Sequence, residues 1–156
     1  YKTPSIGLRF FNVYGPRQDP TNQYSGVISI FINRLMQNKP VIVNGGYQTR
    51  DFIYVDDVVS VMIKSMKHLM SNRSCDVFNV GTGLSITIDQ LLATLAKILK
   101  VEPEVKTKEL LPSDPEKSGG TYEKLTTVLN IDIDQFAKLE EGLRNTIKYI
   151  KNEQSK

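Results

Sequence analysis

Hydrophobic and polar positions alternate along this chain in the manner of strands followed by amphipathic helices. Ser5–Val13 is an almost continuous apolar run, typical of a buried parallel strand, and it is followed by the turn signal Gly15-Pro16. Shorter apolar runs predict strands at 41–43, 52–55, 77–80 and 104–107. Apolar residues at helical spacing predict helices at about 26–38, 58–71, 88–100 and 139–152, and the polar residues 18–25 predict a loop. This alternation predicts an α/β fold in which at least part of the sheet is parallel.

Two of the predicted helices carry start signals. Thr87 and Gln90 have the spacing of a capping box at the start of the helix 88–100. Asp56 or Asp57 offers an N-cap to the helix that follows the strand 52–55. On that helix one apolar face is expected to be buried, formed by Val58, Met62, Met66, Leu69 and Met70.

Length and composition predict one globular unit, residues 1–156, with 40% hydrophobic and 24% charged residues. The net charge of +3 is scattered along the chain, which argues against a nucleic-acid partner. No apolar stretch approaches the roughly 20 residues that span a bilayer, so no membrane partner is expected. A single cysteine and a single histidine argue against a disulfide framework and against a metal site. These properties lead us to expect a soluble, cytoplasmic protein.

The first residues suggest the interior of a larger fold. The chain begins at Tyr1, without an initiator methionine, and enters the apolar run 5–13 within four residues. Buried parallel strands of this kind usually lie inside a sheet. We therefore expect further polypeptide to pack beside this strand.

Three positions could bind a ligand, and each also has a purely structural explanation. Arg50-Asp51 is either a solvated ion pair or an arginine fork that a loop presents to a phosphate or carboxylate. Asn12 follows a predicted strand at the edge where open α/β sheets bind ligands, but it could equally be a turn residue. Gly81-x-Gly83 resembles part of a phosphate loop, but Ile86 occupies the place of the third glycine, so an ordinary strand–turn–helix corner is favoured.

The remaining reactive side chains predict no catalytic residues. Asp56-Asp57 could be paired catalytic carboxylates, but helix capping explains them better. His68 is typical of a helix surface, and Cys75, beside a buried strand, is typical of a core. No nucleophile stands beside a base. From the residues alone, the chain is a binding scaffold.

Four stretches together resemble a known family. They are Leu8–Pro20 (LRFFNVYGPRQDP), Gln48–Val58 (QTRDFIYVDDV), Phe78–Gly83 (FNVGTG) and Leu139–Leu143 (LEEGL). In this order and spacing they are similar to the C-terminal half of nucleotide-sugar epimerases and dehydratases of the extended short-chain dehydrogenase/reductase family, which includes UDP-glucose 4-epimerase. The resemblance implies the C-terminal part of an extended Rossmann-type fold with its small substrate-binding subdomain, and the N-terminal dinucleotide-binding half would be absent.

The resemblance also implies which chemistry this chain lacks. The family binds NAD through a Gly-x-x-Gly-x-x-Gly loop and removes a hydroxyl proton with a Tyr-x-x-x-Lys pair, and neither pattern occurs in the 156 residues. We therefore expect no turnover and no NAD binding by this chain alone. The expected partners are a nucleotide sugar of the UDP-hexose type and the missing N-terminal half or another copy of the chain.

The resemblance assigns site residues by position. Phe10 and Phe11 would lie against the nicotinamide end of NAD. Asn12 would bind the substrate near its diphosphate and Arg50 would bind the pyrophosphate. The other substrate-binding residues would be Val27, bordering the nucleotide through its main chain, Val41 and Val43, lining the base pocket, and Asp114.

Departures from the family pattern keep other functions open. Leu111 replaces the second phosphate-binding arginine, and Val43 replaces an aromatic residue that often packs on the base. One alternative is therefore a non-catalytic remnant or a self-associating module from a split gene. Another is the corresponding part of a nucleotide-sugar 4,6-dehydratase.

Overall fold

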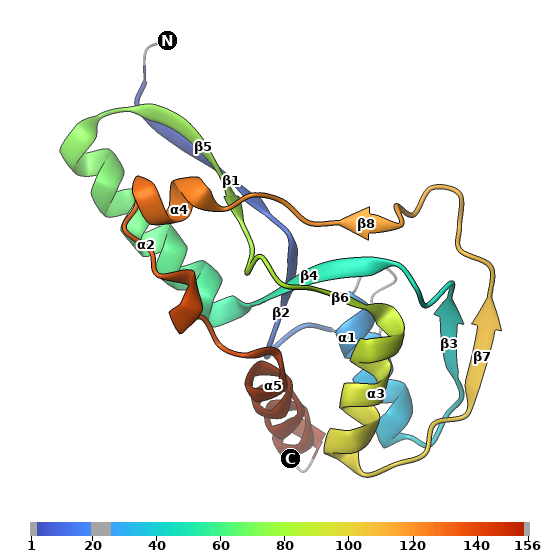
Figure 1. Ribbon diagram of the computed structural model, residues 1–156. Helices are drawn as coiled ribbons and strands as arrows, with labels where there is room; N and C mark the ends of the chain where they lie inside the picture. Colours follow the sequence, from blue (N-terminus) through green and yellow to red (C-terminus); the bar gives the residue numbers. More distant parts are fainter. Residues whose placement is uncertain (1–2, 20–25, 155–156) are drawn as a thin grey trace.

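The structure is a computed structural model that describes residues 3–19 and 26–154 (Figure 1). Most of the predicted loop 18–25 lies outside the described residues. Three parallel strand pairs form the framework: β1 (Ser5–Phe10) with β5 (Cys75–Val80), β2 (Asn12–Tyr14) with β4 (Thr49–Tyr54), and β3 (Val41–Asn44) with β7 (Val105–Lys108). On β4, β6 (Ser85–Thr87) pairs antiparallel and β8 (Lys117–Ser118) pairs parallel. The predicted α/β class with parallel pairing is confirmed.

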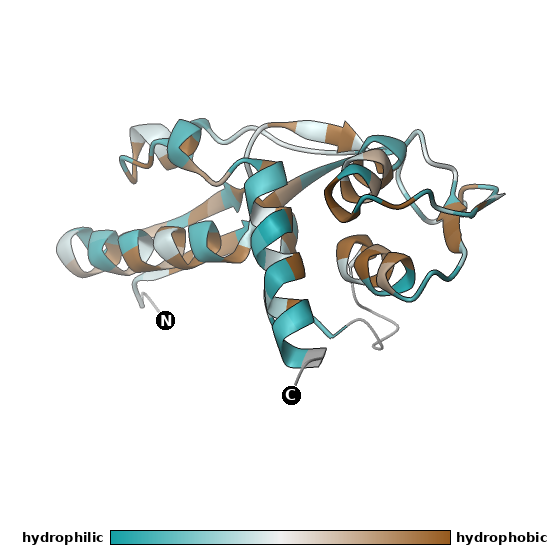
Figure 2. Ribbon diagram, turned by 90° about the horizontal axis from the view of Figure 1, so that it is seen from below, coloured by the Kyte–Doolittle hydropathy of each residue, from teal (hydrophilic) through white to brown (hydrophobic). Residues whose placement is uncertain are grey.

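The helices divide between two regions of the molecule (Figure 1). α2 (Val55–Asn72) and α4 (Glu123–Thr127) lie near the β1–β5 pair. α1 (Val27–Met36), α3 (Ile88–Leu99) and α5 (Leu139–Gln154) lie at the other end, and a short 3-10 helix, η1 (Ile133–Gln135), precedes α5. Figure 2 shows that α5 presents a mostly hydrophilic side outward, in agreement with an amphipathic surface helix.

Each region has its own core of buried side chains. Ile32, Leu91 and Leu143, from α1, α3 and α5, belong to one cluster. Ile53, Phe78 and other residues of β4, α2, β5 and the 122–136 segment form the second cluster. The central strand β4 contributes to both clusters because successive side chains of a strand point to opposite faces.

Some predicted boundaries are confirmed and one strand is divided. Thr87 Oγ1 accepts a hydrogen bond from Gln90 N at 3.1 Å, and Gln90 Oε1 accepts one from Thr87 N at 2.9 Å, so the capping box is present. The single strand predicted at 5–13 is instead two strands, β1 and β2, separated at Phe11. The chain leaves β5 at this residue and joins β4, because Phe11 N still bonds Val80 O while Asn12 already pairs with Phe52.

One prediction about α2 is wrong, and the other, the buried apolar face, is confirmed for Val58 but not for the methionines. The helix begins at Val55 with Tyr54 as its N-cap, so neither Asp56 nor Asp57 caps it; Asp57 Oδ2 instead accepts a hydrogen bond from Ala137 N at 3.0 Å. The buried face contains Val58, Val61 and Ser65, at helical spacing over β1, β2 and β4.

The expected methionine face is exposed instead. Met62, Met66 and Met70 are 49%, 54% and 75% exposed. The prediction relied on the apolar character of the methionines. In the structure, the smaller side chains of Val58, Val61 and Ser65 face the strands instead. Cys75 is also exposed, contrary to expectation, because it lies at the start of β5 with its face uncovered.

The buried carboxylate of Asp51 joins three distant segments. Its side chain is fully buried and accepts hydrogen bonds from Thr82 N at 3.0 Å, Thr82 Oγ1 at 2.7 Å, Gly83 N at 2.9 Å and the Tyr122 hydroxyl at 2.5 Å. Four donors offset the desolvation of a buried charge. This set, which we call the Asp51 clamp, ties β4 to the turn after β5 and to the start of α4.

Two glycines permit the Asp51 clamp. Gly83 has φ +79°, a left-handed conformation that side-chain-bearing residues rarely adopt. A Cβ on Gly81 would lie 2.5 Å from the Tyr122 hydroxyl oxygen, so only glycine lets the ring approach. The predicted strand–turn–helix corner is confirmed, with β6 inserted, and the turn N–H groups bind a carboxylate of the protein itself.

We predict that Val61→Ala lowers the free energy of unfolding by about 2 kcal/mol, because two buried methyl groups and their contacts are lost. Met62→Ala, the matched change at the neighbouring exposed position, should cost less than about 1 kcal/mol. Urea unfolding curves measure both values. Equal losses, or a larger loss for Met62→Ala, would contradict the orientation of α2.

We predict that Tyr122→Phe lowers the free energy of unfolding by about 2 kcal/mol, because it removes a hydrogen bond to a buried charge without changing the ring. Burial, reinforced by Asp51, raises the pKa of Tyr122 above its ordinary value, so the phenol stays a donor at neutral pH. Tyr47→Phe is the matched control, since Tyr47 is 57% exposed, and it should leave the unfolding midpoint nearly unchanged. The clamp has no stabilising role if both variants unfold at the wild-type urea concentration.

Candidate functional site

One cleft of about 480 Å³ brings together residues that are far apart in the sequence. Asn12 enters it from β2, Val27 from α1, Arg50 from β4 and Asp114 from the segment before β8. The other lining residues are Ile30, Phe31, Ile42, Asn44, Gln48 and Ile88. Four of the residues that the resemblance assigned to substrate binding therefore share one cavity, which their spacing alone did not establish.

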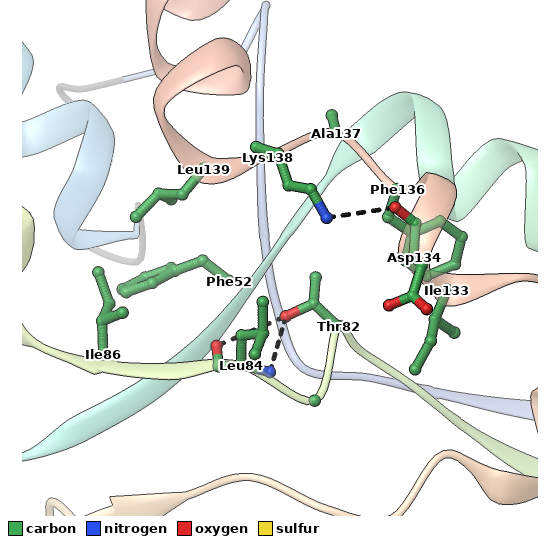
Figure 3. A pocket seen from close by; sticks show the side chains of 11 residues that line it. Phe52, Thr82, Leu84, Ile86, Ile133, Asp134, Phe136, Ala137, Lys138 and Leu139 are labelled. Atoms are coloured by element: carbon green, nitrogen blue, oxygen red, sulfur yellow. Dashed lines mark hydrogen bonds between the residues drawn. The ribbon is translucent and has the colours of Figure 1, made fainter.

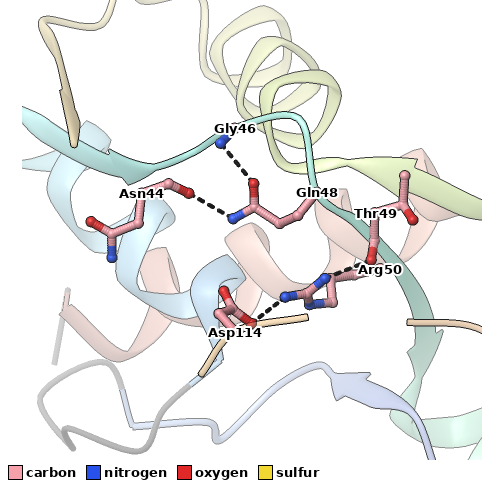
Figure 4. A network of polar contacts seen from close by, with 6 residues as sticks. All are labelled: Asn44, Gly46, Gln48, Thr49, Arg50 and Asp114. Atoms are coloured by element: carbon pink, nitrogen blue, oxygen red, sulfur yellow. Dashed lines mark hydrogen bonds and ion pairs between the residues drawn. The ribbon is translucent and has the colours of Figure 1, made fainter. Parts of the chain in front are cut away.

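Arg50 is the buried cation of this cleft. Its side chain is 10% exposed; Nη1 donates a hydrogen bond to Thr49 O at 2.7 Å, and Nη2 donates to the Asp114 carboxylate (Figure 4). A guanidinium has five N–H donors in a planar fork, so donors remain for an anionic ligand. The arginine is thus held in one orientation from two sides before any ligand arrives.

The suggested Arg50–Asp51 ion pair is not formed. Adjacent residues of a strand point to opposite faces, so Arg50 lines the cleft while Asp51 enters the clamp on the other side of β4. The partner of Arg50 is Asp114, 64 residues further along the chain.

Asn12 lies next to the arginine through the β2–β4 pairing. Its Nδ2 donates to Asp51 O at 3.0 Å, which fixes the amide against the β4 backbone. The second N–H of Nδ2 and the Oδ1 oxygen make no hydrogen bond with any described residue. Asn12 is therefore more than a turn residue: it offers an oriented donor and acceptor at the cleft.

The N-terminus of α1 adds a second positive element. The N-cap, Gly26, has no side chain to bond the first N–H groups, and the first turn contains no acidic residue. Such a terminus carries a partial positive charge and free N–H donors, which suit an anion. Val27, the first helical residue, lines the cleft beside Arg50.

A smaller cleft of about 240 Å³ adjoins the first and shares Asn12 and Val27 with it. Phe11 lies in its wall, with its ring centroid 5.5 Å from that of Tyr122 in an edge-to-face contact. Phe10 lines neither cleft; it is 47% exposed at the end of β1. The two phenylalanines expected at a cofactor therefore point to different surroundings.

The two valines expected to line a base pocket, Val41 and Val43, do not line this cleft. Val41 and Val43 are fully buried in the core, whereas Ile42 and Asn44 line the cleft. Successive residues of a strand point to opposite faces, and the two valines point inward because their apolar side chains pack with those of α1 in one core cluster. The residues of β3 alternate between the two faces of the strand, and Asn44 is polar. The polar residue could have indicated that Ile42 and Asn44 point away from the core.

Gln48 is a further residue that sequence reasoning missed. It is 4% exposed; Nε2 donates to Asn44 O at 2.7 Å, and Oε1 accepts from Gly46 N at 2.7 Å (Figure 4). The sequence Asn44-Gly45-Gly46 predicted a turn, but it did not indicate that the Gln48 side chain holds this turn in place. Gln48 holds the end of β3 at the cleft.

A separate pocket of about 330 Å³ lies between the turn at 82–84 and the segment before α5 (Figure 3). Its walls are largely apolar, with Phe52, Ile86 and Leu139 among them. None of the residues predicted to bind substrate lines it. Among residues 3–19 and 26–154 no cluster of His, Cys, Asp and Glu could hold a metal ion, and no described helix is long and apolar enough to cross a bilayer.

The sequence and the fold of this chain are similar to those of known proteins. Residues 1–81 match the sequence model of the NAD dependent epimerase/dehydratase family. The crystal structure of a UDP-glucose 4-epimerase from Thermotoga maritima, solved with UDP-glucose, superimposes with a TM-score of 0.85 and 36% identity over 96% of this chain and 46% of that one.

Two further relatives represent different reactions. The UDP-glucose 4-epimerase of Mycolicibacterium smegmatis is 33% identical over 90% of this chain and 44% of its own length. The human dTDP-D-glucose 4,6-dehydratase is 35% identical over 64% of this chain and 27% of its own. The chain thus spans less than half of the length of each relative. Its fold is that of the C-terminal part of these Rossmann-type proteins, and it belongs to the NAD-dependent epimerase/dehydratase family.

Proposed function

We propose that this chain is the nucleotide-sugar-binding portion of an NAD-dependent sugar epimerase of the UDP-glucose 4-epimerase type, and that it does not turn over alone. The observation that carries the proposal is the cleft in which Arg50, Asn12 and the uncapped N-terminus of α1 converge. Arg50 and the helix terminus supply positive charge for a diphosphate, and Asn12 supplies a directed amide. Arg50 and Asp114 are the only titratable side chains in the described wall, and they are paired, so the cleft offers binding groups without an acid–base pair.

The described residues do not form a complete site for NAD. A dinucleotide needs a strand–turn–helix whose free N–H groups hold its pyrophosphate. The glycine turn at 81–83 cannot serve, since Asp51 already occupies the N–H groups of Thr82 and Gly83. Phe10 and Phe11 would supply at most a wall for the nicotinamide end, so the cofactor site and the chemistry must come from another polypeptide segment.

The surface around β1 is suited to receive that segment. Among the described residues β1 pairs only with β5, which leaves one edge of the strand unpaired. An open groove of about 570 Å³ crosses the outer face of this pair, lined by Gly7, Cys75 and Val77. Phe10, at the end of β1, is exposed as well, and an unpaired strand edge with exposed apolar residues is the kind of surface that a protein partner covers. We propose the dinucleotide-binding half as that partner; a second copy of the chain is the competing occupant.

We predict that the chain binds UDP-glucose and that Arg50→Gln weakens this binding at least tenfold, because a charge-assisted hydrogen bond contributes roughly 1.5–3 kcal/mol. Arg144→Gln is the matched control: Arg144 pairs with Glu140 on exposed α5 and should leave the affinity unchanged. Isothermal titration calorimetry measures both, and melting curves confirm that the variants are folded. Equal affinities of Arg50→Gln and wild type would exclude the cleft as the diphosphate site.

We predict that mixing this chain with a separately expressed dinucleotide-binding half from a related epimerase, together with NAD⁺ and UDP-glucose, produces UDP-galactose. Either half alone should give none, because binding groups and hydride-transfer groups lie on different segments. Product analysis by chromatography measures the exchange, and size-exclusion chromatography shows whether the halves associate. A stable, folded complex without turnover would contradict the epimerase assignment, and a homodimer that ignores the added half would favour a self-associating module.

A further inference from the structure

The pocket of about 330 Å³ beside α5 has no part in the proposed function, and its two sides differ in chemistry. In Figure 3 the apolar side chains of Phe52, Ile86 and Leu139 lie on one side of the pocket. The charged ends of Asp134 and Lys138 lie on the other side. Its volume is near the lower end for small-molecule sites. The pocket therefore suits a small ligand with an apolar body and a charged end.

Both walls of this pocket are held by hydrogen bonds that need no ligand. On one wall, the Asp51 clamp fixes the turn at 82–83. On the other wall, Ala137 N donates to Asp57 Oδ2 at 3.0 Å. The Tyr14 hydroxyl donates to Leu139 O at 3.3 Å on the same wall. Because both walls are already in place, binding costs little ordering of the protein.

The two charged side chains of the pocket are not paired with each other. Lys138 Nζ donates to the backbone oxygen of Asp134 at 3.2 Å, which places the ammonium beside this residue but leaves both charges without an ion-pair partner. Among residues 3–19 and 26–154, the Asp134 carboxylate accepts no hydrogen bond and joins no ion pair. A ligand with one charge would meet a like charge here, whereas a ligand with both charges is complementary to the pair.

We propose that this pocket binds a free amino acid with an apolar side chain. The Asp134 carboxylate accepts hydrogen bonds from the α-ammonium group, and the Lys138 ammonium donates to the α-carboxylate. The side chain of the amino acid lies against Phe52, Ile86 and Leu139. This site is separate from the 480 Å³ cleft, because the two share no lining residue, and the inference does not depend on the proposed function.

The first test compares four ligands of the wild-type chain by calorimetry. They are L-phenylalanine, phenethylamine, which lacks the carboxylate, hydrocinnamate, which lacks the ammonium, and glycine, which lacks the apolar body. L-phenylalanine should bind at least about tenfold more tightly than each of the others, because each of them loses a charge-assisted hydrogen bond or the apolar contacts.

Two variants assign the charges. Lys138→Gln should weaken the binding of L-phenylalanine about tenfold and leave that of phenethylamine within about twofold. Asp134→Asn should weaken L-phenylalanine to the same degree and leave hydrocinnamate within about twofold. Lys148→Gln is the matched control, since Lys148 is exposed on α5 and does not line the pocket, and it should change none of these affinities.

Three outcomes would overturn the inference. One is an L-phenylalanine affinity no higher than those of the two single-charge analogues. Another is displacement of L-phenylalanine by UDP-glucose, which would place the amino acid in the 480 Å³ cleft. The third is a folded chain that binds no L-phenylalanine at millimolar concentrations. None of them touches the proposed function except displacement, which would support the cleft as a ligand site. The ligand comparisons use the wild-type chain, so they decide the matter even if a variant does not fold.

Discussion

Four hydrogen bonds converge on one fully buried carboxylate, that of Asp51, and the arrangement of the cleft depends on them. A buried carboxylate is costly without hydrogen-bond partners, and the turn at 82–83 and the Tyr122 hydroxyl together supply four of them. The chain between Lys108 and Tyr122 has little regular structure, and the clamp fixes its far end. Asp114, the partner of Arg50, lies within this stretch, and β8 holds the intervening part against Thr49 and Arg50.

The same strand therefore performs two tasks on its two faces. Asp51 points toward the clamp and Arg50 toward the cleft, and the β2 pairing places Asn12 against the peptide between them. A shift of β4 by one residue would turn the arginine toward the clamp and the carboxylate toward the cleft. It would also move the buried side chains of β4 out of their two clusters. The binding groups are thus positioned by strand register, and their precision follows from packing at a distance from any ligand.

Much of this could be predicted from the sequence because the signals were local. The capping box at Thr87 and Gln90, the strand–helix alternation and the glycine corner each depend on a few neighbouring residues, and each is observed. Arg50 and Asn12 were singled out by residue type, and their position in one cleft followed from the resemblance to a family.

What the sequence could not indicate depends on contacts between distant segments. The ion pair of Arg50 with Asp114 and the hydrogen bond of Tyr122 to Asp51 join residues more than sixty positions apart. The face of β3 was misjudged because two valines suit a ligand pocket as well as a core, and only α1 decides between them. The methionines of α2 were assigned to a buried face because they share one apolar side of the helix with Val58, yet Met62, Met66 and Met70 are 49%, 54% and 75% exposed.

The composition of the cleft and the exposed residues of β1 both indicate a binding unit that lacks the groups for a reaction. The cleft has positive charge, oriented amides and apolar walls, which are means of binding, and its one carboxylate is already paired with its one guanidinium. A reaction at a bound sugar needs a group that accepts a proton and a carrier for hydride, and the 156 residues contain neither the tyrosine–lysine pair nor the glycine loop of the family. Under the proposed function, a partner that covers the unpaired edge of β1 and the open groove beside it would supply such groups.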